Sequence, residues 1–366
     1  MKLQVVTLDQ IAAAAGVHKM TVSRALRNHP AVAPTTREKI QRIAQQLGYR
    51  PNPLLTVFQA HVRSRKAPAY VATLGWLVAS VPRDYWERPW TKGLLEGARA
   101  RASALGYKID LIYLGDLKRL SVEEQLDRYR SVMHSRGIHG LIIPLAENPR
   151  FATRVWENTA VVAIGQHHIE MSSQTRQGYG IDSLYHTVSV DFFANMRCAC
   201  EGLRKLGYRR IGLLLNPWLD NITDHQYRAS FAFQQSLWHA REQIPILIDA
   251  NTSELPSDEF RAWFRKYRPE AIIASTHRIA DWLRILSMRV PEDIAIAHMW
   301  IAPDVEGWSG INPRIQEIGA TAVDVLIHQL QHNELHPPAV PRQTEIAGIW
   351  VEGKTTRATH APQSTS

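Results

Sequence analysis

Lysine and arginine side chains are concentrated at the start of this 366-residue chain. Residues 1–66 carry eleven of them against two acidic residues, whereas the rest of the chain carries 32 of each sign. All of the net charge of +9 therefore lies in the N-terminal segment. Cationic groups at this density favour binding to a polyanion, because each phosphate that they neutralise releases condensed counterions. A basic surface that serves only solubility is the alternative.

Three short amphipathic helices are predicted to position these charges. The first begins with Thr7 and Gln10, whose spacing matches a T-x-x-Q capping box, and it ends at Gly16, which can adopt the positive φ of a tight turn. The second begins around His18, and the third has Pro34 in its first turn. Their apolar faces are Leu8, Ile11, Ala12 and Ala15, then Val22, Ala25 and Leu26, then Ile40, Ile43, Ala44 and Leu47. Two helices joined by a glycine turn, with a third packed against them, indicate a helix-turn-helix.

Five stretches of this segment closely resemble the lactose-repressor (LacI/GalR) family of bacterial transcription regulators. They are VTLDQIA at 6–12, AGV at 15–17, TVSRAL at 21–26, TR at 36–37 and LGYRPN at 47–52. The resemblance implies a homodimer whose recognition helices enter adjacent major grooves of a near-palindromic DNA operator.

The resemblance places Lys19 and Met20 at the two specificity positions of the recognition helix, and Arg24 at its groove-facing arginine. Arg24 can donate two parallel hydrogen bonds to guanine O6 and N7, Lys19 offers one flexible charge, and Met20 offers an apolar surface for a thymine methyl. Four residues match positions that approach the sugar-phosphate backbone and orient the helix without reading sequence: Thr7, Thr21, Ser23 and Asn52. The alternatives are that Thr21 caps the helix and that Ser23 is a tolerated surface hydroxyl.

His18 departs from the family pattern, which usually has a small hydroxyl residue that caps the recognition helix and touches phosphate. An imidazole is a poor helix cap. Contact between a charged His18 and a phosphate is the role that this substitution leaves open.

Residues 51–68 are predicted to form a hinge helix and linker. Leu54, Val57 and Phe58 share one helical face, but a helix of about ten residues is marginal alone in water. The resemblance implies that the two hinge helices of a dimer form against each other on operator DNA. It also implies that Leu54 contacts DNA. Phe58, at a position where relatives commonly carry leucine, is expected to wedge into the minor groove. The alternative is a linker whose apolar residues pack on the next domain.

Beyond residue 69, apolar runs alternate with amphipathic stretches, which predicts parallel sheets covered by helices. With the resemblance, the expected fold is an all-α three-helix head followed by an α/β periplasmic-binding-protein-like core of two parallel-sheet subdomains. The predicted strands are 71–79, 109–114, 140–144, 160–165, 211–215, 271–273 and 294–296, and the predicted helices are 93–105, 122–134 and 192–206. The predicted units are a DNA-binding domain (1–50), an effector-binding and dimerisation domain (69–352), and a polar tail (353–366). The middle unit divides into an N-subdomain (about 69–187 and 314–343) and a C-subdomain (about 188–313 and 344–352).

In doubly wound sheets a ligand binds at the carboxyl ends of the strands. The loops expected there carry Tyr85, Trp86, Trp90, Asn216, Trp218, Ser275, Thr276 and His277. The resemblance adds Arg228, where the family keeps an arginine that holds effector hydroxyls, and Trp300, where many sugar-responsive members keep an aspartate with the same task. An indole cannot bind a pair of hydroxyls, but its flat ring can stack on a sugar or a heterocycle. The expected effector is therefore a sugar, a glycoside or a related compound; burial in the core is the alternative for the tryptophans.

Enzyme chemistry is not indicated. The chain has no glycine-rich phosphate loop or nucleophile elbow, and His167 and His168 lack the spacing and neighbours of a metal site, so we expect no cofactor and no metal. Cys198 and Cys200 are two residues apart in a predicted helix and cannot pair there. Two cysteines in a chain of this length, without an apolar run for a signal peptide or membrane span, favour a cytoplasmic protein with no membrane partner.

These observations predict a cytoplasmic homodimer that binds operator DNA and represses carbohydrate-use genes under the control of a small-molecule effector. The alternative is a small-molecule-binding or catalytic α/β protein with an incidental basic head. Deleting residues 1–66 separates the two, because a regulator loses its output whereas an enzyme or carrier keeps its activity.

Overall fold

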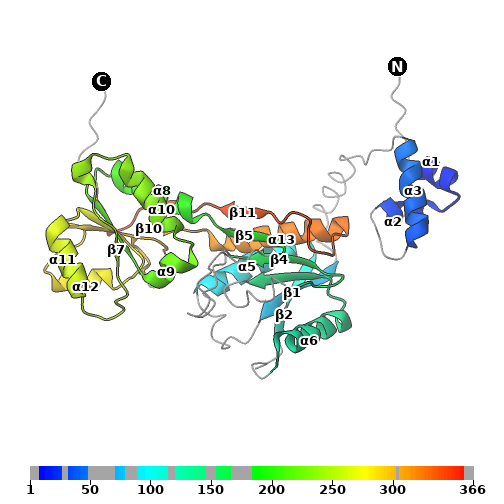
Figure 1. Cartoon of the computed structure of the whole chain (residues 1–366), viewed down its shortest axis with the longest axis horizontal. Helices are drawn as coiled ribbons and strands as arrows, with labels where there is room; N and C mark the ends of the chain where they lie inside the picture. Colours follow the sequence, from blue (N-terminus) through cyan, green and yellow to red (C-terminus); the bar gives the residue numbers. More distant parts are fainter. Residues whose placement is uncertain are drawn as a thin grey trace, which may run out of the picture.

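The computed structural model describes residues 8–26, 32–47, 71–78, 89–113, 120–144, 154–165, 184–301 and 305–357. These residues form a small helical head and two α/β subdomains that lie side by side (Figure 1). The fold class is the predicted one. No helix of the described ranges is long and apolar enough to cross a membrane.

The head consists of helices α1 (Leu8–Ala15), α2 (Lys19–Leu26) and α3 (Pro34–Gln46). Gly16 ends α1 with a φ of +68°, and Pro34 occupies the first turn of α3, as predicted. The three helices bury a common core of Ile11, Ala12, Ala15, Val22, Ala25, Val32, Ile40 and Ala44. Leu47 does not join this core and is 42% exposed, because it is the C-cap residue beyond the last turn of α3.

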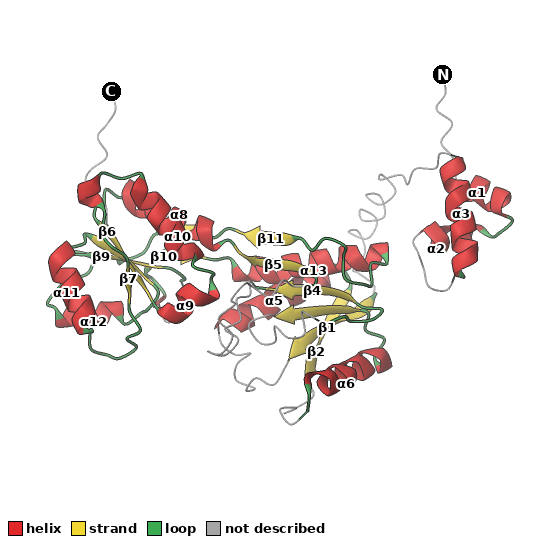
Figure 2. Ribbon diagram, viewed as in Figure 1, coloured by secondary structure: helices red, strands yellow, loops and turns green. Residues whose placement is uncertain are grey.

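The N-subdomain is built on a six-stranded parallel sheet with the order β11-β5-β4-β3-β1-β2. Its strands are β1 (Ala72–Val78), β2 (Tyr107–Tyr113), β3 (Gly140–Pro144), β4 (Ala160–Ile164), β5 (His186–Val190) and β11 (Gln343–Ile346). Helices α5 (Pro89–Ala104) and α13 (Ile315–His332) pack on one face, and α6 (Val122–Ser135) packs on the other (Figure 2). Strands β3 and β4 are buried at every position, which explains their continuous apolar sequences.

The C-subdomain has a second six-stranded sheet with the order β12-β10-β9-β8-β6-β7, in which β12 pairs antiparallel with β10. Its strands are β6 (Ile211–Leu215), β7 (Leu247–Ile248), β8 (Ala271–Ala274), β9 (Ala295–His298), β10 (Ser309–Asn312) and β12 (Ile349–Val351). One face carries α8 (Phe192–Lys205) and α10 (Gln226–Ser236), and the other carries α11 (Asp258–Tyr267) and α12 (Ile279–Ile285). The short helix α9 (Pro217–Ile222) follows β6, and a 3-10 turn spans Ala240–Glu242.

The chain passes from the N-subdomain to the C-subdomain after β5 and again after β11. Both of these passages lie about three residues later than predicted. Strand β5 continues to Val190 and β11 to Ile346, because these residues pair with each other in the N-subdomain sheet. The backbone N–H of Asp191 then donates to the Ile346 carbonyl at 3.0 Å, and the Gly348 N–H donates to the side-chain oxygen of Asn195 at 2.6 Å. The two crossing segments are thus tied to each other where they enter the C-subdomain.

The start of the predicted polar tail is packed in the C-subdomain. Thr355 is 8% exposed, its hydroxyl donates to the Ile296 carbonyl at 2.7 Å, and its carbonyl accepts from the Ile296 N–H at 3.0 Å. Its hydroxyl also accepts from the Ser309 N–H at 2.9 Å. The polar composition of this segment did not indicate that it packs in the C-subdomain, because the segment forms hydrogen bonds with backbone groups beside β9 and β10. Residues 358–366 lie outside the described part of the chain.

Helices α5 and α13 approach each other closely at two glycines. A Cβ atom on Gly97 would lie 2.0 Å from the Gln316 carbonyl oxygen, and a Cβ on Gly319 would lie 2.0 Å from the Leu94 carbonyl oxygen. Neither position can hold a side chain without moving the helices apart. This contact fixes α5, and with it Trp90 in its first turn.

Candidate DNA-contacting head and ligand-contacting loops

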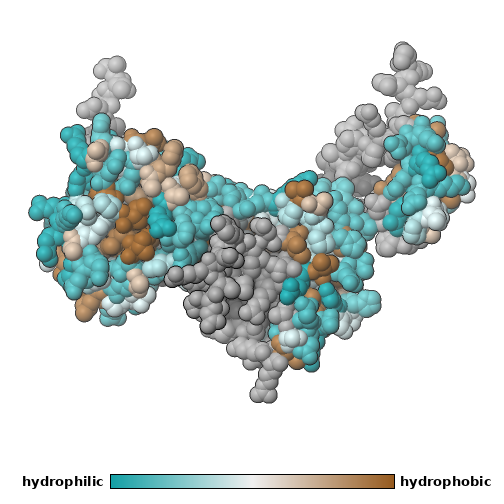
Figure 3. Space-filling model, viewed as in Figure 1, coloured by the Kyte–Doolittle hydropathy of each residue, from teal (hydrophilic) through white to brown (hydrophobic). Residues whose placement is uncertain are grey.

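Helix α2 presents one apolar face to the head and one polar face to solvent. Val22 and Ala25 are fully buried, whereas Lys19, Met20 and Arg24 are exposed. Met20 keeps 58% of its surface exposed although its neighbours on the helix form a core. The described surface of the head is mostly hydrophilic on the face drawn in Figure 3. The three predicted base-contacting side chains therefore project from one helix without a role in the core of the head.

His18 caps α2, contrary to the sequence interpretation. The Met20 N–H donates to His18 Nδ1 at 3.3 Å, and the Thr21 and Val22 N–H groups donate to the His18 carbonyl at 2.8 and 3.2 Å. An imidazole can accept in this way when the ring is neutral and its proton is on Nε2. The ring therefore replaces the usual hydroxyl as an acceptor, and the remaining Nε2–H is the group that it can offer to a phosphate.

Two basic residues of the head have structural roles that the charge count did not reveal. The Lys39 ammonium donates to the Ala15 carbonyl at 3.1 Å, which ties α3 to the end of α1. The Arg37 guanidinium donates to the Val32 carbonyl at 3.1 Å. A cation at the carboxyl end of a helix is favourable because unpaired carbonyls and the helix dipole meet it there. The positive charge of the head is thus shared between folding and an outward surface.

Several predicted site residues lie outside the described ranges. They are Thr7, Asn52, Leu54, Phe58, Tyr85 and Trp86, and the side chain of Ser23 is likewise not described. Thr21 is half-buried on α2.

Loops at the carboxyl ends of β6 and β8 are joined by hydrogen bonds. Asn216 caps α9 by accepting the Trp218 N–H at 2.8 Å, and its own N–H donates to the Ser275 hydroxyl at 3.0 Å. Thr276 accepts the Arg278 N–H at 3.2 Å, and His277 beside it is exposed. Trp218 is 66% exposed and is not a core residue. The structure therefore brings the predicted residues of these two loops to the same edge of the sheet.

Arg228 is held by a buried carboxylate that sequence reasoning missed. The Asp220 side chain on α9 is 5% exposed, and its Oδ2 lies 3.4 Å from Arg228 Nη2 and 2.9 Å from His225 Nδ1. Its Oδ1 is buried and has no hydrogen-bond partner among the described residues. Arg228 keeps 42% of its side chain exposed, so the guanidinium can reach a ligand while Asp220 limits its orientation.

Trp90 and Trp300 meet across the two subdomains. Trp90 lies in the first turn of α5 and packs against the N-subdomain core, whereas Trp300 follows β9 in the C-subdomain. Their ring centroids are 5.2 Å apart and the rings are nearly perpendicular. The Trp300 carbonyl lies 2.5 Å from His298 Nδ1, which fixes the backbone behind the indole. Both indoles are half-buried, so neither is sealed in a core.

No group of three or more His, Cys, Asp or Glu residues within the described ranges is placed to hold a metal ion. Cys198 and Cys200 are free thiols, as predicted.

Two family descriptions match this chain. Residues 7–52 match the bacterial regulatory proteins of the lacI family, and residues 200–356 match the periplasmic binding protein-like domain. The chain therefore carries a head that matches the lacI family and a core that matches the periplasmic binding protein-like domain.

Relatives of known role are distant. The HTH-type transcriptional regulator PtxS of Pseudomonas aeruginosa is 24% identical over 370 residues, which cover 96% of each chain. DegA of Bacillus subtilis is 24% identical over 302 residues, or 79% of this chain and 80% of DegA. CelR of Thermobifida fusca is 26% identical over 216 residues, a match that spans 58% of this chain and 56% of CelR. All three relatives are HTH-type transcriptional regulators.

Solved structures share the fold. The lac repressor dimer bound to operator and the anti-inducer ONPF has 20% sequence identity and a TM-score of 0.51, covering 97% of this chain and 100% of that chain. A CelR–cellobiose complex has 18% identity and a TM-score of 0.50, covering 96% and 99%.

Proposed function

We propose that this chain is a transcriptional repressor that binds a near-palindromic operator as a homodimer and changes its DNA affinity when a small molecule binds between its subdomains. The observation that carries this proposal is helix α2, which buries Val22 and Ala25 and leaves Lys19, Met20 and Arg24 exposed on a head matching the lacI family. Exposed basic side chains on such a helix suit the major groove of DNA.

In this proposal the residues of α2 have separate tasks. Arg24 reads a guanine, Lys19 and Met20 adjust the preference at neighbouring bases, and Thr7, His18, Thr21, Ser23 and Asn52 contact the backbone. Residues 51–68 form the hinge, in which Leu54 contacts DNA and Phe58 wedges between base pairs and bends the operator.

The proposed effector is a sugar, a glycoside or a related compound with a flat face. Arg228, oriented by Asp220, supplies a directed donor, and Trp90 with Trp300 supplies stacking surface from both subdomains. The other proposed effector-contacting residues are Asn216, Trp218, Thr276 and His277, together with Tyr85 and Trp86. The CelR–cellobiose complex supports this class of ligand. A ligand wedged between Trp90 and Trp300 would favour one arrangement of the subdomains, which is what control of DNA affinity requires.

Binding of the full-length chain and of a chain lacking residues 1–66 tests the proposal. An operator duplex is first selected from a random pool, and then sugars and glycosides are titrated against the protein–DNA complex. We expect truncation to abolish DNA binding but to leave sugar binding intact, and one class of sugar to change operator affinity. DNA binding that no sugar changes would contradict the proposed control by an effector. A full-length chain that binds DNA without sequence preference would contradict the proposed operator binding.

A further inference from the structure

A cavity of about 780 Å³ lies at the amino ends of the C-subdomain strands. It opens beside Pro269 and Glu270, which precede β8, and beside Ile294, which precedes β9. Thr276 and Trp300 follow the opposite ends of the same two strands. The cavity is therefore separated from the proposed effector residues by the length of the sheet, and it is not part of that site.

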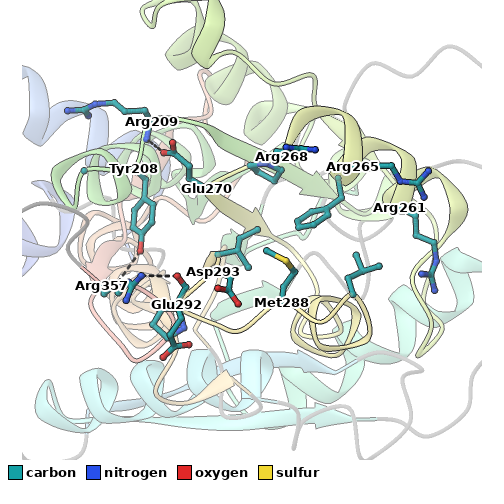
Figure 4. Close-up of a pocket in the computed structure, with 16 residues that line it drawn as sticks. Tyr208, Arg209, Arg261, Arg265, Arg268, Glu270, Met288, Glu292, Asp293 and Arg357 are labelled. Atoms are coloured by element: carbon teal, nitrogen blue, oxygen red, sulfur yellow. Dashed lines mark hydrogen bonds between the residues drawn. The ribbon is translucent and has the colours of Figure 1, made fainter.

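Three guanidinium groups line one wall of this cavity (Figure 4). Arg261 and Arg265 stand one helical turn apart on α11, and Arg268 follows at its C-cap. None of the three has a salt-bridge partner within the described part of the chain, and the Arg261 guanidinium donates to the Pro256 carbonyl at 3.4 Å. Arg261 is half-buried and Arg265 and Arg268 are exposed, so all three guanidinium groups are accessible to an anion.

Two of the three acidic residues around the cavity, Glu270 and Asp293, are already engaged. Glu270 accepts the backbone N–H groups of Arg209 and Arg210 at 2.7 and 3.1 Å. Asp293 accepts from both the side chain and the backbone of Arg289, and these bonds hold the pKa of its carboxyl well below its usual range. Glu292 also lines the cavity, but the lining has five arginines against three carboxylates, so the wall keeps its positive potential.

The floor of the cavity is apolar. Phe264 from α11 lies with Leu286 and Met288, which follow α12, and all three are half-buried. A space of this volume is within the range of small-molecule sites, which combine an apolar lining with a few charged anchors. A flat apolar body on this floor would bring an attached anionic group to the arginine wall.

We propose that this cavity binds a small organic anion, a carboxylate or a phosphate ester attached to an apolar body, as a second ligand site distinct from the effector site. Guanidinium groups bind carboxylate and phosphate with paired hydrogen bonds, so both anions suit the wall. The volume of about 780 Å³ suits a small molecule, and the apolar floor favours an organic anion over free phosphate.

Calorimetric titration of the full-length protein tests this site with 1-naphthyl phosphate as the probe, and with 1-naphthol and inorganic phosphate as its separate halves. We expect the intact probe to bind at least tenfold more tightly than either half. The double variant Arg261→Gln/Arg265→Gln should bind the probe at least tenfold more weakly than the parent. Met288→Glu, which adds a carboxylate to the floor, should do the same. Arg197→Gln is the matched control, because Arg197 is an exposed arginine on α8 paired with Glu201 and outside the cavity.

Equal affinity for 1-naphthol and 1-naphthyl phosphate would overturn the proposal, because the guanidiniums would then contribute nothing. Unchanged affinity in the double variant, or an equal loss in Arg197→Gln, would overturn it as well. Absence of binding at millimolar probe, or binding of an acidic peptide alone, would reassign the wall to another role. A 1-naphthyl carboxylate that binds as well as the phosphate would support the shared anion chemistry.

Discussion

The indole rings of Trp90 and Trp300 meet edge to face with centroids 5.2 Å apart and an angle of 80° between their planes. The two residues belong to different subdomains and are 210 positions apart in the chain. An edge-to-face pair of this kind contributes about 0.5–1.5 kcal/mol beyond the area that it buries. A ligand that inserts between the rings must replace this contact, which links ligand binding to the distance between the subdomains.

Replacing Trp300 with alanine should therefore lower the affinity for the effector about tenfold, because one stacking face is lost. Trp300→Phe keeps a ring and should recover most of the affinity. Tryptophan fluorescence during a sugar titration reports both values. Affinity that is the same in the alanine variant and in the parent would show that Trp300 packs between the subdomains without touching the effector.

Asp220→Asn should weaken effector binding by releasing Arg228 from its buried carboxylate. The 3.4 Å separation and the half-exposed guanidinium limit the electrostatic share, so we expect a loss of about 0.5–1 kcal/mol. The double variant with Arg228→Ala should be no weaker than Arg228→Ala alone, since Asp220 acts through that arginine. Additive losses in this mutant cycle would instead indicate that Asp220 contacts the effector itself.

His18→Ala should loosen the start of α2, because the Met20 N–H loses its acceptor. The expected cost is about 1 kcal/mol, or roughly a fivefold faster hydrogen exchange of the α2 amides in the full-length chain. His18→Ser supplies a hydroxyl cap and should restore protection. Exchange that is unaffected by the alanine substitution would mean that the imidazole contributes no cap in solution.

Gly97→Ala should lower the unfolding temperature strongly, because its Cβ would overlap the Gln316 carbonyl oxygen. We expect a loss of about 3 kcal/mol, at the upper end of the usual cost of overpacking. Gly93→Ala on the same helix is the control, since its Cβ would meet Ile315 Cγ2 at an ordinary 3.4 Å. That change should be neutral or stabilising, because alanine favours a helix over glycine. Equal effects at the two positions would contradict the close approach of α5 and α13.

Local signals were sufficient to predict the main elements of the fold. Strands β3 and β6 have the predicted bounds, because each is a short apolar run buried on both faces. Strand β11 was not predicted, since its residues alternate between half-buried and exposed and its partner β5 lies far away in sequence. Thr355 was assigned to a polar tail for a similar reason, because its hydrogen-bond partners become neighbours only after folding.

The sequence did not predict the contacts that the candidate site residues make. Resemblance identified Arg228, yet the role of Asp220 depends on the turn that brings α9 against α10. The pairing of Trp90 with Trp300 depends on how the two subdomains meet, which no local pattern encodes. The cap at His18 was missed because side-chain preferences at helix starts are averages, and here an imidazole reaches the Met20 N–H.

In the proposed function, α2 reads base sequence through Arg24. Parallel selections from a random duplex pool test it directly with the full-length parent, Arg24→Ala and Lys39→Gln. Lys39 is the matched control, because its ammonium is bonded to the Ala15 carbonyl within the head. We predict a near-palindromic motif for the parent. Arg24→Ala should lose about 1–3 kcal/mol and its preference at one position per half-site, whereas Lys39→Gln should keep every preference. An Arg24→Ala motif identical to that of the parent at every position, or no motif for the parent, would contradict the account.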